Sequence, residues 1–232
     1  MNINNGQNFL KKIIYNITPF TTTDYKDHLS CIVWFNSCNM RCQYCYNPEI
    51  VNAKTGLYNL EDLYIFLNKR VGLLDAVVLS GGEATTHDLI NICKQIKDLG
   101  FKIKLDTNGS NPKQLKNLID KNLLDFVAID FKSTKEKFKI ITKSNHYDSF
   151  LNSLKILNNS NIEYEVRTTL HSDLLNEQDI NKMQTILIEN DYKKDYCIQN
   201  FLEVENLSNL KGSLNHFDKS KLSNDFNIVW RN

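Results

Sequence analysis

Short apolar runs rich in β-branched residues alternate along this chain with segments whose apolar residues recur at helical spacing. Runs of about four to eight such residues are typical of buried strands, and an i, i+3, i+4, i+7 repeat is typical of a helix that covers a sheet. This alternation predicts repeated βα units with a parallel sheet, which is an α/β fold. The expected strands are residues 31–35, 75–80, 101–106, 126–131, 162–168 and 196–201.

The segments between the expected strands carry the helical repeat. Apolar stripes mark four predicted helices, at residues 60–67, 89–96, 150–157 and 180–187. Asn111 and Pro112 fit the cap and first position of a fifth helix, and Gly100 fits a left-handed residue that ends the preceding one. We see no Gly/Ser-rich linker or internal repeat. A single domain over residues 1–232 is therefore predicted, with a core at about 30–202 and an extension at each end.

Six βα units are too few to close an eight-stranded barrel, so the predicted architecture is a partial (β/α)6 TIM-type barrel with an open side. In parallel barrels the functional residues collect at the carboxyl ends of the strands. Polar and glycine-rich motifs mark these ends of the first four expected strands: SCNMRCQYC at 37–45, GGEATT at 81–86, DTNGS at 106–110 and DFK at 130–132. The functional site is therefore expected at this one end.

The charge of the chain gives little reason to expect a polyanionic partner. There are 28 Lys and Arg against 27 Asp and Glu, a formal charge of +1, so no long-range field attracts nucleic acid or an acidic membrane. The first residues lack the apolar core of a signal peptide, and no apolar run is long enough to span a bilayer. We expect a cytoplasmic protein that binds neither nucleic acid nor membranes.

Three of the six cysteines, Cys38, Cys42 and Cys45, form a C-x3-C-x2-C motif. A loop this short lets three thiolates bind one metal centre, and thiolates favour zinc or an iron-sulfur cluster. A structural zinc site normally needs four protein ligands, and no Cys or His pair at finger spacing follows the trio. Three thiolates on a four-iron cluster would leave one iron open for substrate chemistry. The other three cysteines are expected to be small buried hydrophobic residues: Cys31, Cys93 and Cys197.

The run CNMRCQYCYNPEI at 38–50, with an aromatic residue before the third cysteine, resembles the signature of the radical S-adenosylmethionine (SAM) superfamily. Within it, the NPE tripeptide is similar to that of the activases of glycyl radical enzymes, especially the activating protein of the anaerobic ribonucleoside-triphosphate reductase. The likeness continues through SGGEAT, LDTNGS, VAIDFK and an Arg-Thr-Thr stretch. The order and spacing of these motifs carry the resemblance from about residue 32 to residue 167.

The resemblance implies the cofactors and the partners. It implies a 4Fe-4S cluster whose open iron binds SAM, and an electron from a low-potential donor such as flavodoxin or ferredoxin. The 5'-deoxyadenosyl radical then removes a hydrogen from the substrate, which in an activase is a glycine of a large partner enzyme. Similarity to the pyruvate formate-lyase activase adds a monovalent cation held by two aspartates. Because the cofactor carries this chemistry, the protein's task is to bind, to orient and to exclude water.

The resemblance assigns the methionyl part of SAM to the second and third motifs. Gly81 and Gly82 would let backbone lie against the ligand, although a glycine pair after a strand by itself indicates an ordinary tight turn. Glu83 would accept from the ligand ammonium in a charge-assisted hydrogen bond. The other residues assigned here end the third strand: Asp106, Thr107 and Asn108.

Five more residues are assigned to the rest of the ligand. Tyr44 and Tyr46 flank the third cysteine and are expected to touch adenine, with core packing as the alternative. Asp130 is expected to share the cation with the aspartate of the third strand, and a cation or Lys132 is needed to offset two carboxylates that face one site. Arg167 is expected to hold the carboxylate or ribose, with an exposed surface cation as the alternative.

Other functions stay open at this point. A compact small-molecule radical SAM enzyme such as a 7-carboxy-7-deazaguanine synthase, or another activase of the pyruvate formate-lyase type, fits the same motifs. A different class is an iron-sulfur electron carrier or a zinc-stabilised binding protein. An electron carrier ordinarily ligates its cluster fully and has no use for GGE and DTNG motifs that face the same opening, so the enzyme is favoured.

Overall fold

A computed structural model describes residues 11–231, which form two compact units interleaved along the chain. The described part of the first unit comprises residues 11–39, 49–107 and 113–127, and that of the second comprises 40–48, 108–112 and 128–231. Each predicted site residue therefore belongs to one unit or the other. The single-domain organisation stays a prediction.

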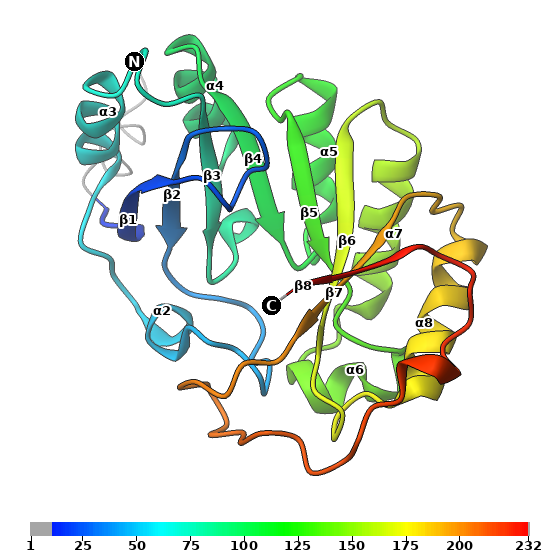
Figure 1. Ribbon diagram of the computed structural model, residues 1–232. Coiled ribbons are helices and arrows are strands. Elements are labelled where there is room, and N and C mark those ends of the chain that lie inside the picture. The colour runs from blue at the N-terminus through cyan, green and yellow to red at the C-terminus, as the bar shows by residue number, and fades with distance from the viewer. Residues whose placement is uncertain (1–10, 232) are drawn as a thin grey trace. The chain divides into compact units, whose positions relative to one another are not determined.

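The first unit is built on a sheet in which one antiparallel strand precedes parallel ones (Figure 1). Its strands are β1 (Ile14–Thr21), β2 (Ser30–Phe35), β3 (Ala76–Gly81) and β4 (Lys102–Thr107). Cys31 of β2 pairs with Val77 of β3, which pairs with Ile103 of β4, so the three parallel strands run in register. Nearly every residue of β2 and β3 is buried, as expected for parallel strands whose two faces are both covered.

The helices of the first unit form where the apolar stripes predicted them. They are α3 (Leu60–Asn68), α4 (Ile90–Asp98) and most of α5 (Pro112–Asp120). A capping box between Asn59 and Asp62 fixes the start of α3. Helix α5 begins at Pro112 as predicted, and Gly100 has the left-handed φ of +89° predicted after α4. Helices α3 and α4 cover one face of the strands (Figure 1) and bury their apolar stripes there.

The second unit continues the parallel arrangement. Its elements are β6 (Glu163–Leu170), β7 (Tyr196–Asn200), β8 (Ile228–Arg231), α6 (Lys135–Thr142), α7 (Tyr147–Asn158) and α8 (Glu177–Glu189). Strand β5 (Phe126–Asp130) is shared: just before it, Asp125 N–H donates to Ile103 O in the first unit, and just after it, Phe131 N–H donates to Arg167 O in the second. The strands are thus ordered β1 to β8 as in the chain.

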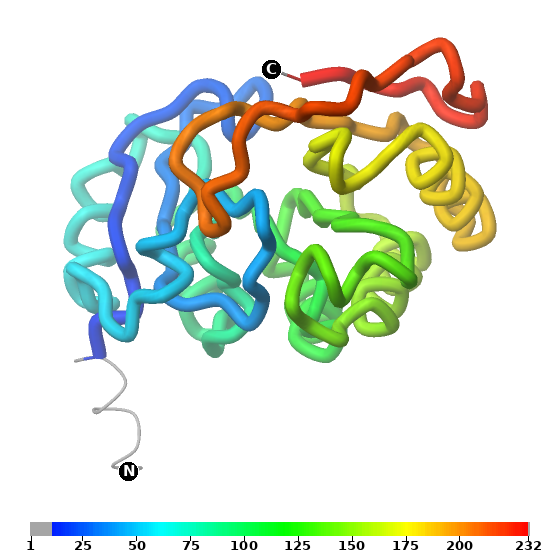
Figure 2. Tube along the Cα trace, turned by 90° about the horizontal axis from the view of Figure 1, so that it is seen from below, coloured from blue at the N-terminus to red at the C-terminus, as the bar shows by residue number. Residues whose placement is uncertain are grey.

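The segment after β7 is irregular before it reaches β8. It contains a short 3-10 helix, η2 (Lys219–Lys221). Figure 2 shows this orange-to-red segment beside the blue chain of the cysteine loop, and the two are joined by a hydrogen bond from Leu207 N–H to Cys45 O of 2.9 Å. The sequence gives no periodic signal over this stretch, so its role beside the loop was not predicted.

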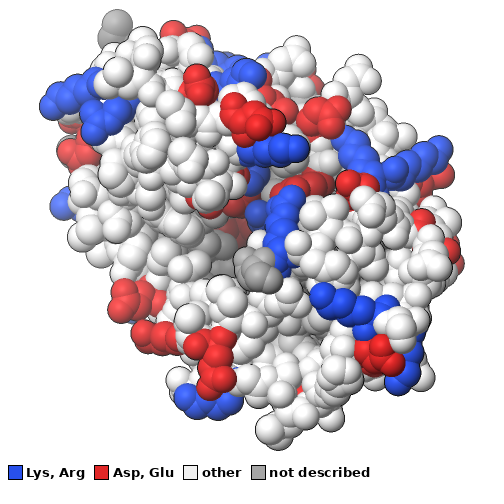
Figure 3. Space-filling model, viewed as in Figure 1, with Lys and Arg blue, Asp and Glu red and all other residues white. Residues whose placement is uncertain are grey.

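The predicted α/β class and parallel strand order are confirmed, and the fold is the partial TIM-type barrel expected from the sequence. All six expected strands are present within two residues of their predicted ends. The antiparallel β1 and the C-terminal β8 were not among the six expected strands, and the helices α2 (Pro48–Asn52) and α6 were missed. Among residues 11–231, no helix is both long and apolar enough to cross a membrane. Lys, Arg, Asp and Glu side chains occur side by side on the face shown in Figure 3, as the near-zero net charge suggests.

Candidate active site

In the first unit, the glycine pair after β3 brings two backbone segments into contact. A Cβ on Gly81 would lie 2.3 Å from the backbone O of Phe35, and one on Gly82 would lie 1.7 Å from that of Ser37. Gly82 N–H donates to Phe35 O and Glu83 N–H donates to Ser37 O, both at 2.9 Å. The pair is therefore required where the chain enters the cysteine loop, a packing role that the sequence analysis did not foresee.

Glu83 joins the carboxyl ends of β3 and β4. Its side chain is buried, and Oε1 accepts hydrogen bonds from the Thr85 amide at 3.1 Å and the Thr85 hydroxyl at 2.6 Å. The same oxygen accepts from the Thr107 hydroxyl at 2.7 Å. Glu83 and Thr107, both predicted site residues, are thus brought together, and Thr85 is a partner that the motif search missed. The short 3-10 helix η1 (Ala84–Thr86) begins after Glu83 because this carboxylate caps it.

Asp106 and Asn108 lie at the end of β4 and just beyond it. The Oδ1 atom of Asp106 lies 3.3 Å from Nζ of Lys104, a lysine to which the sequence analysis gave no role. Asn108 belongs to the second unit, where its side-chain oxygen accepts from the Ser110 amide at 2.9 Å. This contact forms an Asx turn that shapes the DTNGS loop.

The part of the cysteine loop that belongs to the second unit is anchored on α6. Arg41 N–H donates to Thr142 O and Gln43 N–H donates to Ile141 O, so the loop lies against the end of α6. Cys45 N–H donates to Cys42 O at 3.1 Å, which turns the chain and brings these two cysteines together. Burial raises the pKa of the Cys42 thiol to about 11, so this thiol ionises at neutral pH only with a metal to stabilise the thiolate.

The two tyrosines of the loop differ in their environment. Tyr44 is buried, and its hydroxyl finds no hydrogen-bond partner among the residues that the structure describes. An unsatisfied buried hydroxyl is costly and needs an explanation such as a ligand. Tyr46 instead accepts a hydrogen bond from Leu202 N–H at 2.7 Å and packs on the Phe201 ring, so it ties the loop to the segment after β7.

Asp130, Lys132 and Arg167 form an ion-pair network whose side chains are 13–25% exposed. Nζ of Lys132 lies 3.0 Å from Oδ2 of Asp130, while Nε and Nη2 of Arg167 each lie 3.0 Å from Oδ1. Burial alone would raise the pKa of Asp130, but the charges of Arg167 and Lys132 lower it below its ordinary value. The side chain of Arg167 is only 13% exposed, so the alternative of a solvated surface cation is wrong. The Asp130 carboxylate thus lies between two cations.

The three cysteines outside the loop are buried, as predicted, and the ligand role of the loop cysteines stays a prediction. Cys31, Cys93 and Cys197 are buried, and burial raises the pKa of Cys31 and Cys93 to about 12 and that of Cys197 to about 11. All six thiols are free of disulfides. Among residues 11–231, no three His, Cys, Asp or Glu side chains are arranged to hold one metal ion. In a four-iron cluster each cysteine binds a different iron, so its ligands do not converge on one point.

The model of the "Radical SAM superfamily" matches residues 32–187 of this chain, which is more than half of it. The chain belongs to the radical SAM superfamily. It is a radical SAM enzyme, and its cofactors are a 4Fe-4S cluster and SAM. The three loop cysteines supply a donor set that fits such a cluster, because thiolates are the ligands that iron-sulfur clusters take.

Two curated relatives match most of this radical SAM enzyme. It is 32% identical over 200 residues to a putative glycyl-radical enzyme activating enzyme of Methanocaldococcus jannaschii, covering 83% of this chain and 81% of the relative. It is 27% identical over 203 residues to the pyruvate formate-lyase-activating enzyme of Clostridium pasteurianum, covering 82% and 79%. The resemblance noted in the sequence therefore extends beyond the short motifs.

Solved structures share the fold of this radical SAM enzyme. The structure titled "Native anSMEcpe with bound AdoMet" superimposes with a TM-score of 0.60 at 17% identity, covering 72% of this chain. Streptococcus suis SuiB, solved with its precursor peptide SuiA, gives a TM-score of 0.61 at 15% identity and covers 74%. This chain spans 49% of the first structure and 39% of the second, so it shares their fold over part of their length.

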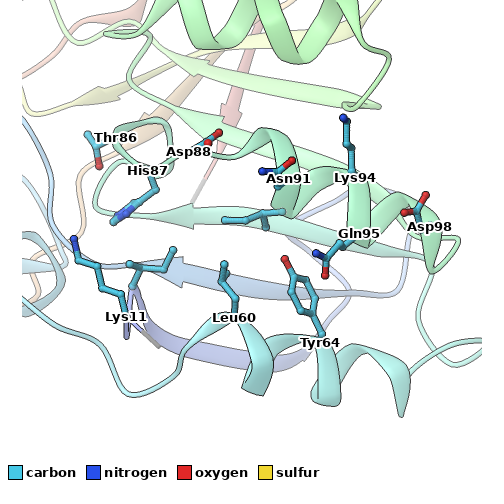
Figure 4. Close-up of a pocket in the computed structure, with 12 residues that line it drawn as sticks. Lys11, Leu60, Tyr64, Thr86, His87, Asp88, Asn91, Lys94, Gln95 and Asp98 are labelled. Carbon is cyan, nitrogen blue, oxygen red and sulfur yellow. The ribbon is translucent and has the colours of Figure 1, made fainter. Parts of the chain in front are cut away.

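The pocket in Figure 4 lies in the first unit and is separate from the predicted site residues. Its volume is about 600 Å³, and it opens between α3 and α4, with Tyr64 of α3 facing Gln95 of α4. His87 lines one end, where its Nε2 lies 3.0 Å from Asn36 O. Burial lowers the pKa of His87 below its ordinary value. No residue predicted to bind the cluster or SAM lines this pocket.

Glu83 gives the first testable prediction. If it binds the SAM ammonium, Glu83→Gln should weaken SAM binding by about one to two decades, because a hydrogen bond to a charged group contributes roughly 1.5–3 kcal/mol. The amide oxygen of Gln still accepts from Thr85 and Thr107, so the fold and the iron content should persist. Glu83→Ala would remove this acceptor as well, and we expect it to lower stability too. Titration calorimetry with SAM checks this, and an unchanged affinity of Glu83→Gln would contradict the assignment.

Proposed function

We propose that this radical SAM enzyme is an activase that makes a glycyl radical on a partner protein, and that the partner is the anaerobic ribonucleoside-triphosphate reductase. The observation that carries the activase class is the similarity to a putative glycyl-radical enzyme activating enzyme over about four fifths of both chains. The NPE tripeptide after Cys45 favours the reductase as partner. An activase of the pyruvate formate-lyase type is the alternative nearest to this reading.

The site residues are proposed to hold the two cofactors as follows. Cys38, Cys42 and Cys45 ligate the cluster, which supplies the electron that cleaves SAM. Glu83 accepts a hydrogen bond from the SAM ammonium. The hydroxyls of Thr85 and Thr107 donate to the same carboxylate and fix its orientation. Preorganised partners of this kind lower the cost of ligand binding, because the side chain is already ordered.

The second unit is proposed to receive the acidic part of SAM. The two cations at Asp130, Lys132 and Arg167, suit a carboxylate, because hydrogen bonds between a cation and a carboxylate are among the strong ones. Lys132 Nζ also lies 5.8 Å from the centroid of the Tyr44 ring. The Tyr44 ring thus lies beside this network, and its hydroxyl, which has no hydrogen-bond partner among the described residues, offers SAM a donor. The monovalent cation, the low-potential electron donor and the cytoplasmic location stay predictions.

The partner is tested by electron paramagnetic resonance. Anaerobically reconstituted enzyme, reductant and SAM should produce a glycyl radical doublet on added anaerobic reductase. The matched control is a reductase whose C-terminal radical glycine is changed to Ala, and it should give no signal. The proposal fails if the Ala variant gains the same radical. It also fails if no protein radical forms while a pterin substrate is consumed, which would favour the 7-carboxy-7-deazaguanine synthase alternative.

A further inference from the structure

Lys104 is a buried cation in the middle of β4 that the proposed function leaves unused. It is 5% exposed, which is rare for lysine unless the charge is paired. Its Nζ lies 3.3 Å from Oδ1 of Asp106 and also donates a hydrogen bond to the backbone oxygen of Asp24. The ammonium is therefore held between a loop at the start of the sheet and a carboxylate at its functional end.

The surroundings of this ammonium are apolar. Lys104 pairs in register with Val78, which pairs with Ile32, so the three side chains share one row across three strands. Tyr25 and Ala76 complete the buried cluster at Ile32 and Val78. The centroid of the Phe126 ring lies 5.9 Å from Nζ of Lys104. An ammonium in such a place is stable only with a fixed anionic partner.

The strand geometry makes Asp106 that partner. Side chains two residues apart on a strand point to the same face, so Lys104 and Asp106 face the same way, with Asp106 nearer the carboxyl end of β4. The side chains of the lysine and the aspartate are 7% and 17% exposed. Bulk water therefore screens this pair less than it screens a surface pair.

We propose that Lys104 is a positioning residue for SAM binding, a counter-ion built into β4 that neutralises and orients Asp106. The inference rests on the proposed assignment of Asp106 to the SAM site. It has a consequence for the expected monovalent cation. Because the ammonium already supplies a positive charge to Asp106, SAM binding by this enzyme should not require added Na⁺ or K⁺.

The test compares SAM affinities of anaerobically reconstituted holoenzymes by titration calorimetry. Lys104→Met keeps the length of the side chain and removes the charge, and it should weaken SAM binding about tenfold. Lys102→Met is the matched control, because Lys102 lies two residues earlier on β4, is exposed and contacts His28. The control should bind SAM as the wild type does. Lys104→Arg keeps the charge and should bind more tightly than Lys104→Met.

Two further readouts distinguish positioning from a merely structural role. In an Asp106→Asn background, Lys104→Met should change affinity less than twofold, because its partner is already gone. At constant ionic strength, K⁺ in place of a bulky organic cation should restore part of the Lys104→Met affinity and leave the wild type unchanged. Equal losses in both backgrounds, or a wild type that needs K⁺, would overturn the proposal. SAM binding needs no glycyl radical partner. The measured SAM affinities would therefore still test the role of Lys104 if the proposed activase function were wrong.

Discussion

Changing Cys38, Cys42 or Cys45 to Ala should each abolish SAM cleavage, whereas the same change at three other cysteines should leave it largely intact. If the three loop cysteines are the protein ligands of the cluster, loss of any one leaves two irons without a protein ligand, and the four-iron cluster is not retained. The expected losses are of the whole activity and of most of the bound iron. The matched controls are the three buried cysteines outside the loop: Cys31, Cys93 and Cys197.

Iron content and 5'-deoxyadenosine release measure this prediction in all six variants. A small cost in stability is expected for the controls, since removing a buried sulfur leaves a cavity. Their iron content should nevertheless match that of the wild type. A Cys42→Ala protein with full activity would contradict the ligand assignment. Loss of iron from Cys197→Ala would show that a fourth thiol takes part.

The strands could be predicted because their burial is continuous. Parallel strands that are covered on both faces need continuous apolar runs. Such runs are visible in the sequence at residues 76–79 and 127–129, which are buried in β3 and β5. Strand β1 alternates buried, half-buried and exposed residues and pairs antiparallel with bulges. Helix α6 has only eight residues and three buried side chains. Short or half-exposed elements are decided by tertiary contacts, which local periodicity does not contain.

Candidate site residues that belong to a sequence motif were predicted. Those defined only by a contact between distant parts of the chain were missed. The cysteine, GGE and DTNG motifs name residues by type and spacing. Lys104 was missed because an isolated lysine in a strand resembles an edge residue until the sheet shows it buried. The hydrogen bond between Leu202 and Tyr46 joins residues 156 apart in the chain. No local pattern predicts such a contact.

Replacing Asp130, the anion of the network with Lys132 and Arg167, should have a large effect on stability. Asp130→Ala should lower the free energy of unfolding by roughly 3–5 kcal/mol, because it removes the carboxylate that two largely buried cations share. The side chains of Lys132 and Arg167 are 14% and 13% exposed, so water compensates little. Asp148→Ala is the matched control in the same unit. Its pair with Lys135 is 73% and 66% exposed, and its removal should cost less than about 1 kcal/mol.

Urea unfolding followed by circular dichroism, at pH 7 and at decreasing pH, measures both changes. The pKa of Asp130 lies below its ordinary value of 3.8 in the folded protein, so its contribution is present above about pH 4 and is lost as the pH falls through the folded pKa. The gap between wild type and Asp130→Ala should therefore be full at pH 7 and shrink only below about pH 4. Equal costs for Asp130→Ala and Asp148→Ala at pH 7 would contradict the ion-pair network. A gap that closes above pH 5 would mean that Arg167 and Lys132 do not hold Asp130 in its ionised form.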